Sequence, residues 1–189
     1  MKYFKISSIL TAIALVCALI LAAMDMLTSP IVAKNNEKTE YDTIVSIFKD
    51  YDKDKSNKID VPADGIIKSL IKAKDASGKD LGYIYTVEGK NAYGNIKLMV
   101  AIKDGKVIQV EFLENGQSFA STVDAHVQAS YPSSEKKSIE VGFVSDKNKF
   151  EGTLSKADVD KIDVACGATY GAKLVKELVN EALKDAEGR

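Results

Sequence analysis

The chain has 189 residues, a formal net charge of −1 at pH 7, no tryptophan and a single histidine. This length suffices for one domain plus an anchor, and the balanced charge provides no basic field of the kind that binds nucleic acid. The two cysteines, Cys17 and Cys166, show neither C-x-x-C nor iron–sulfur spacing, so any redox chemistry must come from an organic cofactor.

The first predicted element is an apolar helix near the N-terminus. Residues 6–24 carry no charge, and at 1.5 Å per residue they span about 28 Å, close to the hydrocarbon core of a bilayer. Lys2 and Lys5 precede this run, so the positive-inside rule favours a single-pass anchor in the cell membrane with an extracytoplasmic C-terminal part. Lysines after the run weaken this orientation, and a signal peptide cleaved near Ala23 is the alternative. We assign residues 1–33 to a transmembrane anchor with a short cytoplasmic end.

Residues 34–65 are charged and polar and predict a linker. The apolar residues between positions 41 and 48 predict a short amphipathic helix within it. The stretch from Asp52 to Asp60 resembles the first nine positions of an EF-hand calcium loop. Position twelve of that loop would be Ala63, which lacks the bidentate carboxylate. A solvated linker is therefore the favoured interpretation.

Four strands are predicted next, over Ile66–Ile71, Leu81–Val87, Ile96–Ile102 and Val107–Leu113, and apolar residues alternate in the second and third of them. Asp104-Gly105 is a strong hairpin signal between the last two. The segment of residues 114–137 is then expected to form a loop and a short helix. These patterns predict an α+β fold, an antiparallel sheet packed by helices, after one N-terminal transmembrane helix.

Two further features precede the C-terminal helix. The pattern from Ile139 to Val144 predicts another strand. His126 has no cluster of Cys or Glu near it, so a surface or partly packed histidine is favoured over a metal ligand or general base.

The segment from Asp163 to Thr169 is the most informative part of the chain, because an amphipathic helix pattern follows it directly. Thr169 therefore starts a helix, where unpaired N–H groups and the helix dipole favour a phosphate. Gly167 and Ala168 are small and keep the approach to the hydroxyl open. An ordinary helix N-terminus without a ligand is the alternative.

This segment resembles the FMN-binding domain family, which includes the G component of Rnf electron transport complexes and the C component of Na⁺-translocating NADH:quinone reductases. More diffuse glycine and tyrosine patterns extend the resemblance from Leu27 to Leu183. Cys166 stands where the family usually has Ser or Thr, and Gly171 where a second Ser or Thr often follows. The positions that match the motif are Asp163, Gly167, Ala168 and Thr169.

The resemblance implies that a dedicated flavin transferase esterifies Thr169 to the phosphate of FMN and recognises Asp163. Tyr170 could stack on the isoalloxazine ring or pack in the core. Lys173 could approach the phosphate or pair with Glu177. No catalytic residue and no metal ligand is expected. The expected cofactor-binding residues are Thr169, Asp163, Cys166, Gly167, Ala168 and Tyr170.

Residues 66–189 are accordingly expected to form an extracytoplasmic FMN-binding domain. The resemblance implies a redox component of an Rnf-like, ion-translocating complex of the ferredoxin:NAD type, with other membrane subunits as partners, rather than an enzyme acting alone. The loop from Glu114 to Thr122 lacks the Pro-Gly pair that is usual in the family. This departure keeps open a stand-alone extracytoplasmic flavoprotein of an electron-transfer chain or reductase. An anchored ligand-binding module without a cofactor is the third hypothesis.

Overall fold

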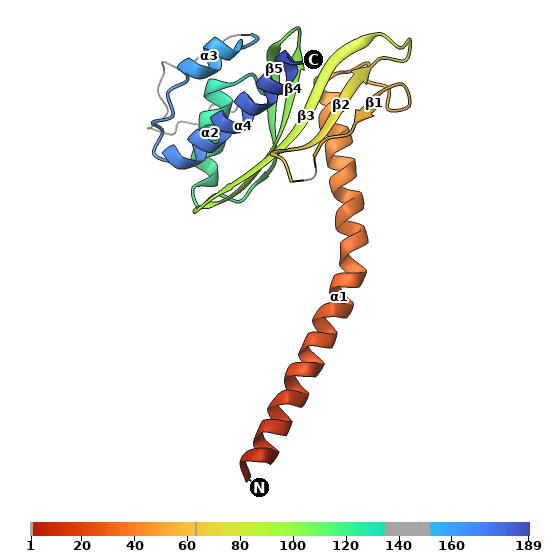
Figure 1. Cartoon of the computed structure of the whole chain (residues 1–189), viewed down its shortest axis with the longest axis vertical. Coiled ribbons are helices and arrows are strands. Elements are labelled where there is room, and N and C mark those ends of the chain that lie inside the picture. Colours follow the sequence, from red (N-terminus) through yellow and green to blue (C-terminus); the bar gives the residue numbers. More distant parts are fainter. Residues whose placement is uncertain (1, 63, 135–151) are drawn as a thin grey trace. The chain divides into compact units, whose positions relative to one another are not determined.

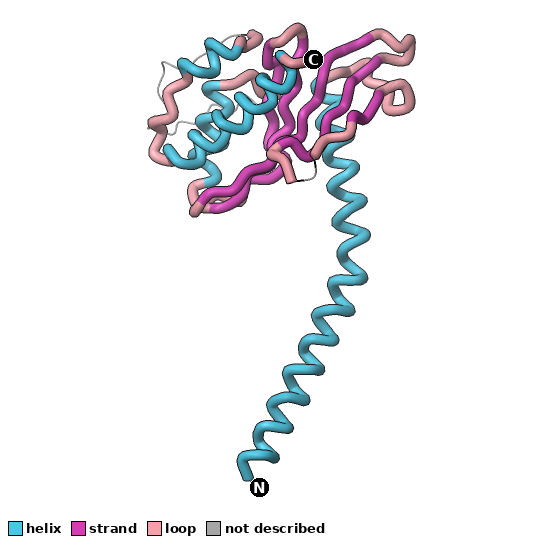
Figure 2. Tube along the Cα trace, viewed as in Figure 1, coloured by secondary structure: helices cyan, strands magenta, loops and turns pink. Residues whose placement is uncertain are grey.

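The computed structural model of the chain describes residues 2–62, 64–134 and 152–189, and side chains from residue 7 onward. The chain divides into two units, residues 1–42 and residues 43–189, and each is described by itself. The predicted strand at 139–144 lies outside the described residues. Figure 2 shows that the first unit is helical and that the second combines a sheet with helices.

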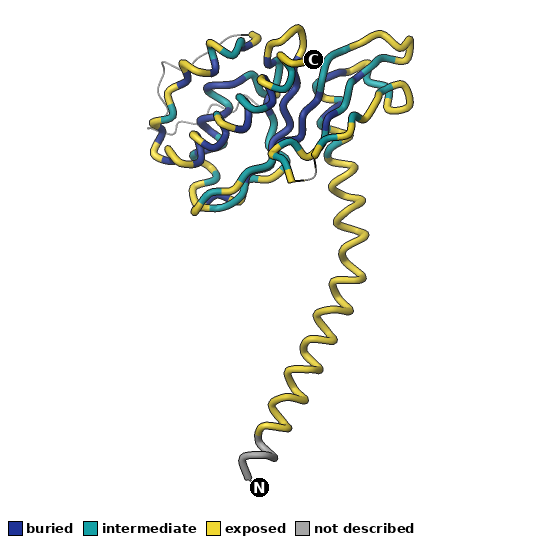
Figure 3. The backbone as a smooth tube through the Cα atoms, in the orientation of Figure 1, coloured by how far each residue is buried: buried dark blue, intermediate teal, exposed yellow. Residues whose placement is uncertain are grey.

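The first unit belongs to a single helix, α1, which runs from Lys2 to Ile47. From Ser7 onward this helix is long and apolar enough to cross a membrane by length and composition. Its residues 7–42 are almost all exposed (Figure 3). The amphipathic helix expected at 41–48 is the C-terminal end of α1. No glycine or proline occurs between Ile31 and Ile47, so nothing in the sequence interrupts the helix there.

The second unit contains an antiparallel sheet in the order β1-β2-β3-β4-β5, so each strand pairs with its neighbours in sequence. The strands predicted by alternation are confirmed, although β3 and β4 form a longer hairpin than expected. Asp104 and Gly105 join β4 to β5 with φ angles of 52° and 70°, as a tight hairpin turn requires. The strands are β1 (Asn57–Ile59), β2 (Ile67–Lys74), β3 (Asp80–Asn91), β4 (Gly94–Lys103) and β5 (Lys106–Asn115).

The inner strand β4 contributes to two apolar clusters, because its successive side chains point to opposite faces of the sheet. One face carries the larger cluster and is covered by helices α2 and α4 (Figure 1). The other face packs Met99 and Ala101 against Ile44 and Phe48, at the end of α1 and just after it. The remaining helices are α2 (Ala120–Ser130), α3 (Lys156–Lys161) and α4 (Thr169–Glu187).

Candidate functional site

The segment that joins α3 to α4 is fixed by helices on two sides. From α4, the Nζ of Lys176 donates hydrogen bonds to the carbonyl oxygens of Asp160 at 2.7 Å and Ile162 at 3.0 Å. From α2, Nε2 of His126 lies 2.8 Å from the carbonyl oxygen of Asp163. A carbonyl accepts and cannot donate, so Nε2 carries the proton in this contact. The segment before Thr169 is therefore held in one conformation by its neighbours.

His126 is fully buried, so the expectation of a surface or partly packed histidine is wrong as to its burial. The α2 helix presents this side chain to the interior beside Val123 and Val127, which belong to the core cluster. Burial lowers the pKa of His126, and the hydrogen bond and charge of Asp163 oppose this effect in part. The imidazole is thus neutral at pH 7 and serves as a donor to the motif.

The buried histidine predicts a pH dependence of stability. Its pKa is lower in the folded chain than the value near 6.5 of an unfolded histidine, so the unfolded state binds more protons below that pH. We expect the free energy of unfolding to be highest above about pH 6.5 and to fall as the pH drops through the unfolded and then the folded pKa. Urea unfolding of the full chain between pH 7.5 and 5.5 measures this.

His126→Gln is the matched control, since its side-chain amide keeps a donor without titrating. It should remove most of the pH dependence in this window, because the chain contains no other histidine. A slope that persists unchanged in His126→Gln would contradict the assignment to His126.

The start of α4 lacks a side-chain cap. Asp163 folds back on its own turn and accepts a hydrogen bond from the backbone N–H of Ala165 at 3.0 Å. Gly167 follows with a φ of 80°, a conformation that glycine adopts without strain. The N-cap residue, Ala168, has no side-chain acceptor, and Thr169 is the exposed first residue of the helix. The N–H of Gly171 donates to the carbonyl oxygen of Ala168 at 3.0 Å, and no described residue accepts from the N–H groups of Thr169 and Tyr170, which therefore remain available for an anionic group.

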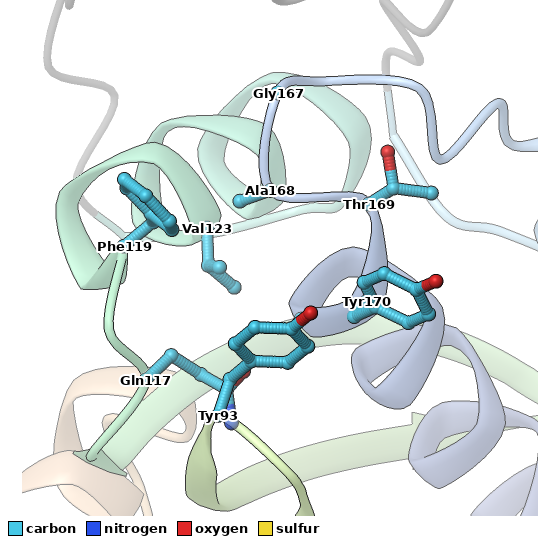
Figure 4. A pocket seen from close by; sticks show the side chains of 9 residues that line it. Tyr93, Gln117, Phe119, Val123, Gly167, Ala168, Thr169 and Tyr170 are labelled. Atoms are coloured by element: carbon cyan, nitrogen blue, oxygen red, sulfur yellow. The ribbon is translucent and has the colours of Figure 1, made fainter.

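A cavity of about 260 Å³ opens at this helix start. Tyr93, from the turn between β3 and β4, stacks on Tyr170 with ring centroids 5.3 Å apart and an interplanar angle of 26°. Tyr170 is 64 % exposed, so its interpretation as a core residue is wrong. Figure 4 shows how these side chains surround the cavity. The residues that line it are Tyr93, Gln117, Phe119, Val123, Gly167, Ala168, Thr169, Tyr170 and Gly171.

A hydrogen-bond network fixes the hairpin turn beside the cavity. Asn91 donates from Nδ2 to the carbonyl oxygen of Tyr170 at 3.2 Å, and its Oδ1 accepts from the N–H of Tyr93 at 2.8 Å. The Nε2 of Gln117 donates to the Oδ1 of Asn91 at 3.1 Å and to the carbonyl oxygen of Gly94 at 2.7 Å. These bonds connect the β3–β4 hairpin, the loop after β5 and the start of α4 around one cavity.

Gly171 lets α2 and α4 approach closely at the cavity wall. A Cβ atom at this position would lie 2.5 Å from Cγ2 of Val123 and 3.2 Å from Oε1 of Gln117. The first distance is too short for a real contact, and the branched Val123 side chain has few alternative rotamers. The absence of a Ser or Thr side chain at position 171 therefore has a packing reason in this chain.

Four of the six expected cofactor-binding residues line the cavity, namely residues 167 to 170. Asp163 does not line it and instead shapes the turn before the helix. Cys166 is buried in the core cluster with 1 % of its surface exposed, and burial raises the pKa of its thiol. Sequence reasoning missed Tyr93 and Gln117 as residues of the cavity wall, and Gln117 lies in the loop from Glu114 to Thr122 that departs from the family pattern.

The other expectations from the sequence concern the surface. Lys173 and Glu177 form an exposed ion pair at 4.0 Å, in accordance with their spacing. In the stretch that resembles an EF-hand, Oδ1 of Asp52 accepts from the backbone N–H groups of Asp54 and Lys55, so this carboxylate closes a turn. Among the described residues, no group of three His, Cys, Asp or Glu side chains is arranged to hold a metal ion.

Comparisons with known proteins agree with the geometry of this site. Residues 92–184, which include the cavity-lining residues, match the family model of the FMN-binding domain. The chain is also 27 % identical over 183 residues to the G component of the proton-translocating ferredoxin:NAD(+) oxidoreductase complex of Clostridium ljungdahlii. That alignment covers 96 % of this chain and 90 % of the relative. The resemblance inferred from the motif at Thr169 is thus confirmed.

Proposed function

Since residues 92–184 match the FMN-binding domain family, we propose that the chain is a flavoprotein that carries FMN linked through its phosphate to Thr169. One observation carries this proposal. The hydroxyl residue of the motif is the exposed first residue of α4, at an uncapped helix start that opens on a cavity with aromatic walls. The helix start suits the phosphate ester of FMN, and the aromatic walls suit its flat ring system, so both parts of one ligand find a fitting environment next to each other.

Each part of the site has a role in holding the flavin. The phosphodiester at Thr169 keeps one negative charge, which the start of α4 stabilises by about 0.3–1 kcal/mol. Tyr93, Tyr170 and Phe119 offer aromatic faces beside it. Bound FMN supplies the redox chemistry, and the protein supplies attachment and orientation. The described residues that line the cavity include no carboxylate, histidine or lysine that would act as a general acid or base.

The size of the cavity favours an electron carrier. Its volume of about 260 Å³ is below the range of about 300–1,000 Å³ that is typical of sites enclosing a small molecule. A flavin held at Thr169 would therefore keep part of its surface exposed. An exposed flavin edge suits electron exchange with another protein better than it suits the enclosure of a substrate.

We further propose that the chain acts as the G component of an Rnf-like complex that couples electron transfer to ion translocation. The similarity to the relative from Clostridium ljungdahlii extends over nearly all of both chains, including the long N-terminal helix. In this proposal α1 anchors the chain in the cell membrane, and residues 66–189 lie on the extracytoplasmic side. The partners are the other membrane subunits and the flavin transferase that matures Thr169.

A second candidate is a stand-alone extracytoplasmic flavoprotein. The loop between β5 and α2 supports it, because Gln117 and Phe119 stand in a segment that lacks the Pro-Gly pair of the resembling proteins. Purification of the tagged chain from native membranes in mild detergent distinguishes the two. Co-purification of other redox subunits supports the complex, and recovery of the chain alone supports the second candidate.

Peptide mapping tests the attachment site. The chain would be co-expressed with a flavin transferase, digested with trypsin and analysed by mass spectrometry. The motif lies within one tryptic peptide, residues 162–173, between the cleavage sites at Lys161 and Lys173. We expect this peptide to carry the mass of FMN less one water, with fragment ions that locate it on Thr169.

Protein made without the transferase is the control and should yield the unmodified peptide. Flavin on another peptide, or an unmodified peptide when a known acceptor is fully loaded under the same conditions, would contradict the proposal.

A further inference from the structure

The side chain of Gln117 is buried at the cavity with its amide orientation determined. Only 7 % of its surface is exposed. Both hydrogens of Nε2 are engaged, by Oδ1 of Asn91 and by the carbonyl oxygen of Gly94. The Asn91 Oδ1 also accepts from a backbone N–H, and a carbonyl can only accept. The amide of Gln117 therefore cannot be flipped without losing both bonds.

One polar atom of Gln117 remains for a ligand. No described residue donates a hydrogen bond to Oε1, although this side chain lines the cavity. The atom lies beside Gly171, because a Cβ atom added to that residue would be 3.2 Å from Oε1. Oε1 is not one of the fully enclosed unpaired polar atoms among the described residues, so it remains accessible from the cavity that this side chain lines. A group that enters the cavity and donates a hydrogen bond can therefore pair with this oxygen.

The position of Gln117 in the cavity indicates which part of a flavin attached at Thr169 would lie next to it. In Figure 4, Gln117 and Phe119 lie on the side of the cavity away from Thr169. A flavin attached by its phosphate at Thr169 would direct its ring toward this side, where Phe119 and Tyr93 offer aromatic faces. In the oxidised isoalloxazine ring the imide N3–H is the single donor, and all other polar ring atoms are acceptors.

We propose that Oε1 of Gln117 accepts the hydrogen bond of the flavin N3–H and so fixes which edge of the ring enters the cavity. Gln117 is then a specificity-determining residue, and Asn91 is the positioning residue that orients its amide. This inference rests on the proposed flavin site and deepens it, because neither the motif nor the family match assigns a hydrogen-bond partner to the ring.

The test compares two ligands on the same protein. The full-length chain, made without a transferase and held in detergent, is titrated with FMN and with N3-methyl-FMN, and binding is followed by flavin fluorescence. Methylation removes the donor and leaves Oε1 unpaired, so we expect the wild-type chain to bind FMN about tenfold more tightly than the methylated analogue. Gln117→Met should reduce this preference to within about twofold.

The controls separate this inference from general damage and from the proposed function. Gln109→Met is the matched control, because Gln109 lies on β5 away from the cavity and bonds Glu111 instead; it should keep the tenfold preference. Gln117→Met also removes the hydrogen bonds to Asn91 and Gly94 and can therefore weaken the binding of both flavins. The readout is for this reason the ratio of the affinities for FMN and N3-methyl-FMN, and not either affinity alone. Equal binding by the wild-type chain, or a ratio unchanged in Gln117→Met, would overturn this inference alone. Failure of the wild-type chain to bind FMN, together with failure of transferase loading, would overturn the proposed function as well.

Discussion

Thr169→Ala is expected to eliminate covalently bound flavin, whereas Thr169→Ser is expected to retain it to within about twofold of the wild-type amount. The hydroxyl of residue 169 is the atom that would form the phosphoester, and serine keeps it at the start of α4. Residue 169 is exposed and contributes no core packing, so both variants should fold. In-gel flavin fluorescence after denaturing electrophoresis, with each chain co-expressed with a flavin transferase, measures the covalent product.

Thr122→Ala controls for loss of a threonine elsewhere in the domain. Thr122 lies in the first turn of α2 and does not line the cavity, so this variant should label as the wild-type chain does. Persistent fluorescence in Thr169→Ala would show that another residue carries the flavin and would refute the attachment site.

Gly94→Ala is expected to destabilise the domain by about 3 kcal/mol or more. Gly94 begins β4 with a φ of 140°, a conformation that residues with a side chain rarely adopt. A Cβ atom there would lie 1.9 Å from the carbonyl oxygen of Gly116 and 3.1 Å from the backbone nitrogen of Gln117. Backbone atoms of the neighbouring segment would have to move, and the bond from Gln117 to the Gly94 carbonyl would be disturbed. Urea unfolding of the full chain measures the loss.

Gly105→Ala provides the comparison, because Gly105 also has a positive φ but no atom within 4 Å of the added Cβ. Its cost should be limited to the backbone preference, about 1 kcal/mol. If the two variants lost similar stability, the close approach at Gly94 would not be the cause of its effect.

The strands were predictable from local patterns, and the cavity was not. Alternation of Ile96, Leu98, Val100 and Ile102 indicated a strand with one buried face, and these four residues do lie in one core cluster. The Asp104-Gly105 pair likewise determined its hairpin without help from distant residues. Strands and hairpins could thus be predicted wherever the residues of a single segment determine its secondary structure.

The features that sequence reasoning missed depend on contacts between distant segments. Tyr93 reaches Tyr170 only because the hairpin of β3 and β4 ends beside the start of α4. His126 is buried because α2 packs this face against the motif segment, which a lone histidine in a short helix does not reveal. The motif itself was recognised because its small residues and its hydroxyl lie next to one another in the sequence. The sequence therefore predicted Thr169 as the attachment residue, and the tertiary structure showed which residues from other segments surround it.

The burial of Cys166 has a consequence for the compartment in which the domain can work. Its thiol lies three residues from Thr169 and is enclosed by the core cluster, and its raised pKa keeps it protonated. Thiolates, not thiols, react with disulfides and peroxides. The other cysteine, Cys17, lies within the apolar helix α1. Burial and a raised pKa therefore protect the Cys166 thiol from oxidation, and we expect it to stay reduced when the folded domain is exposed to oxidants.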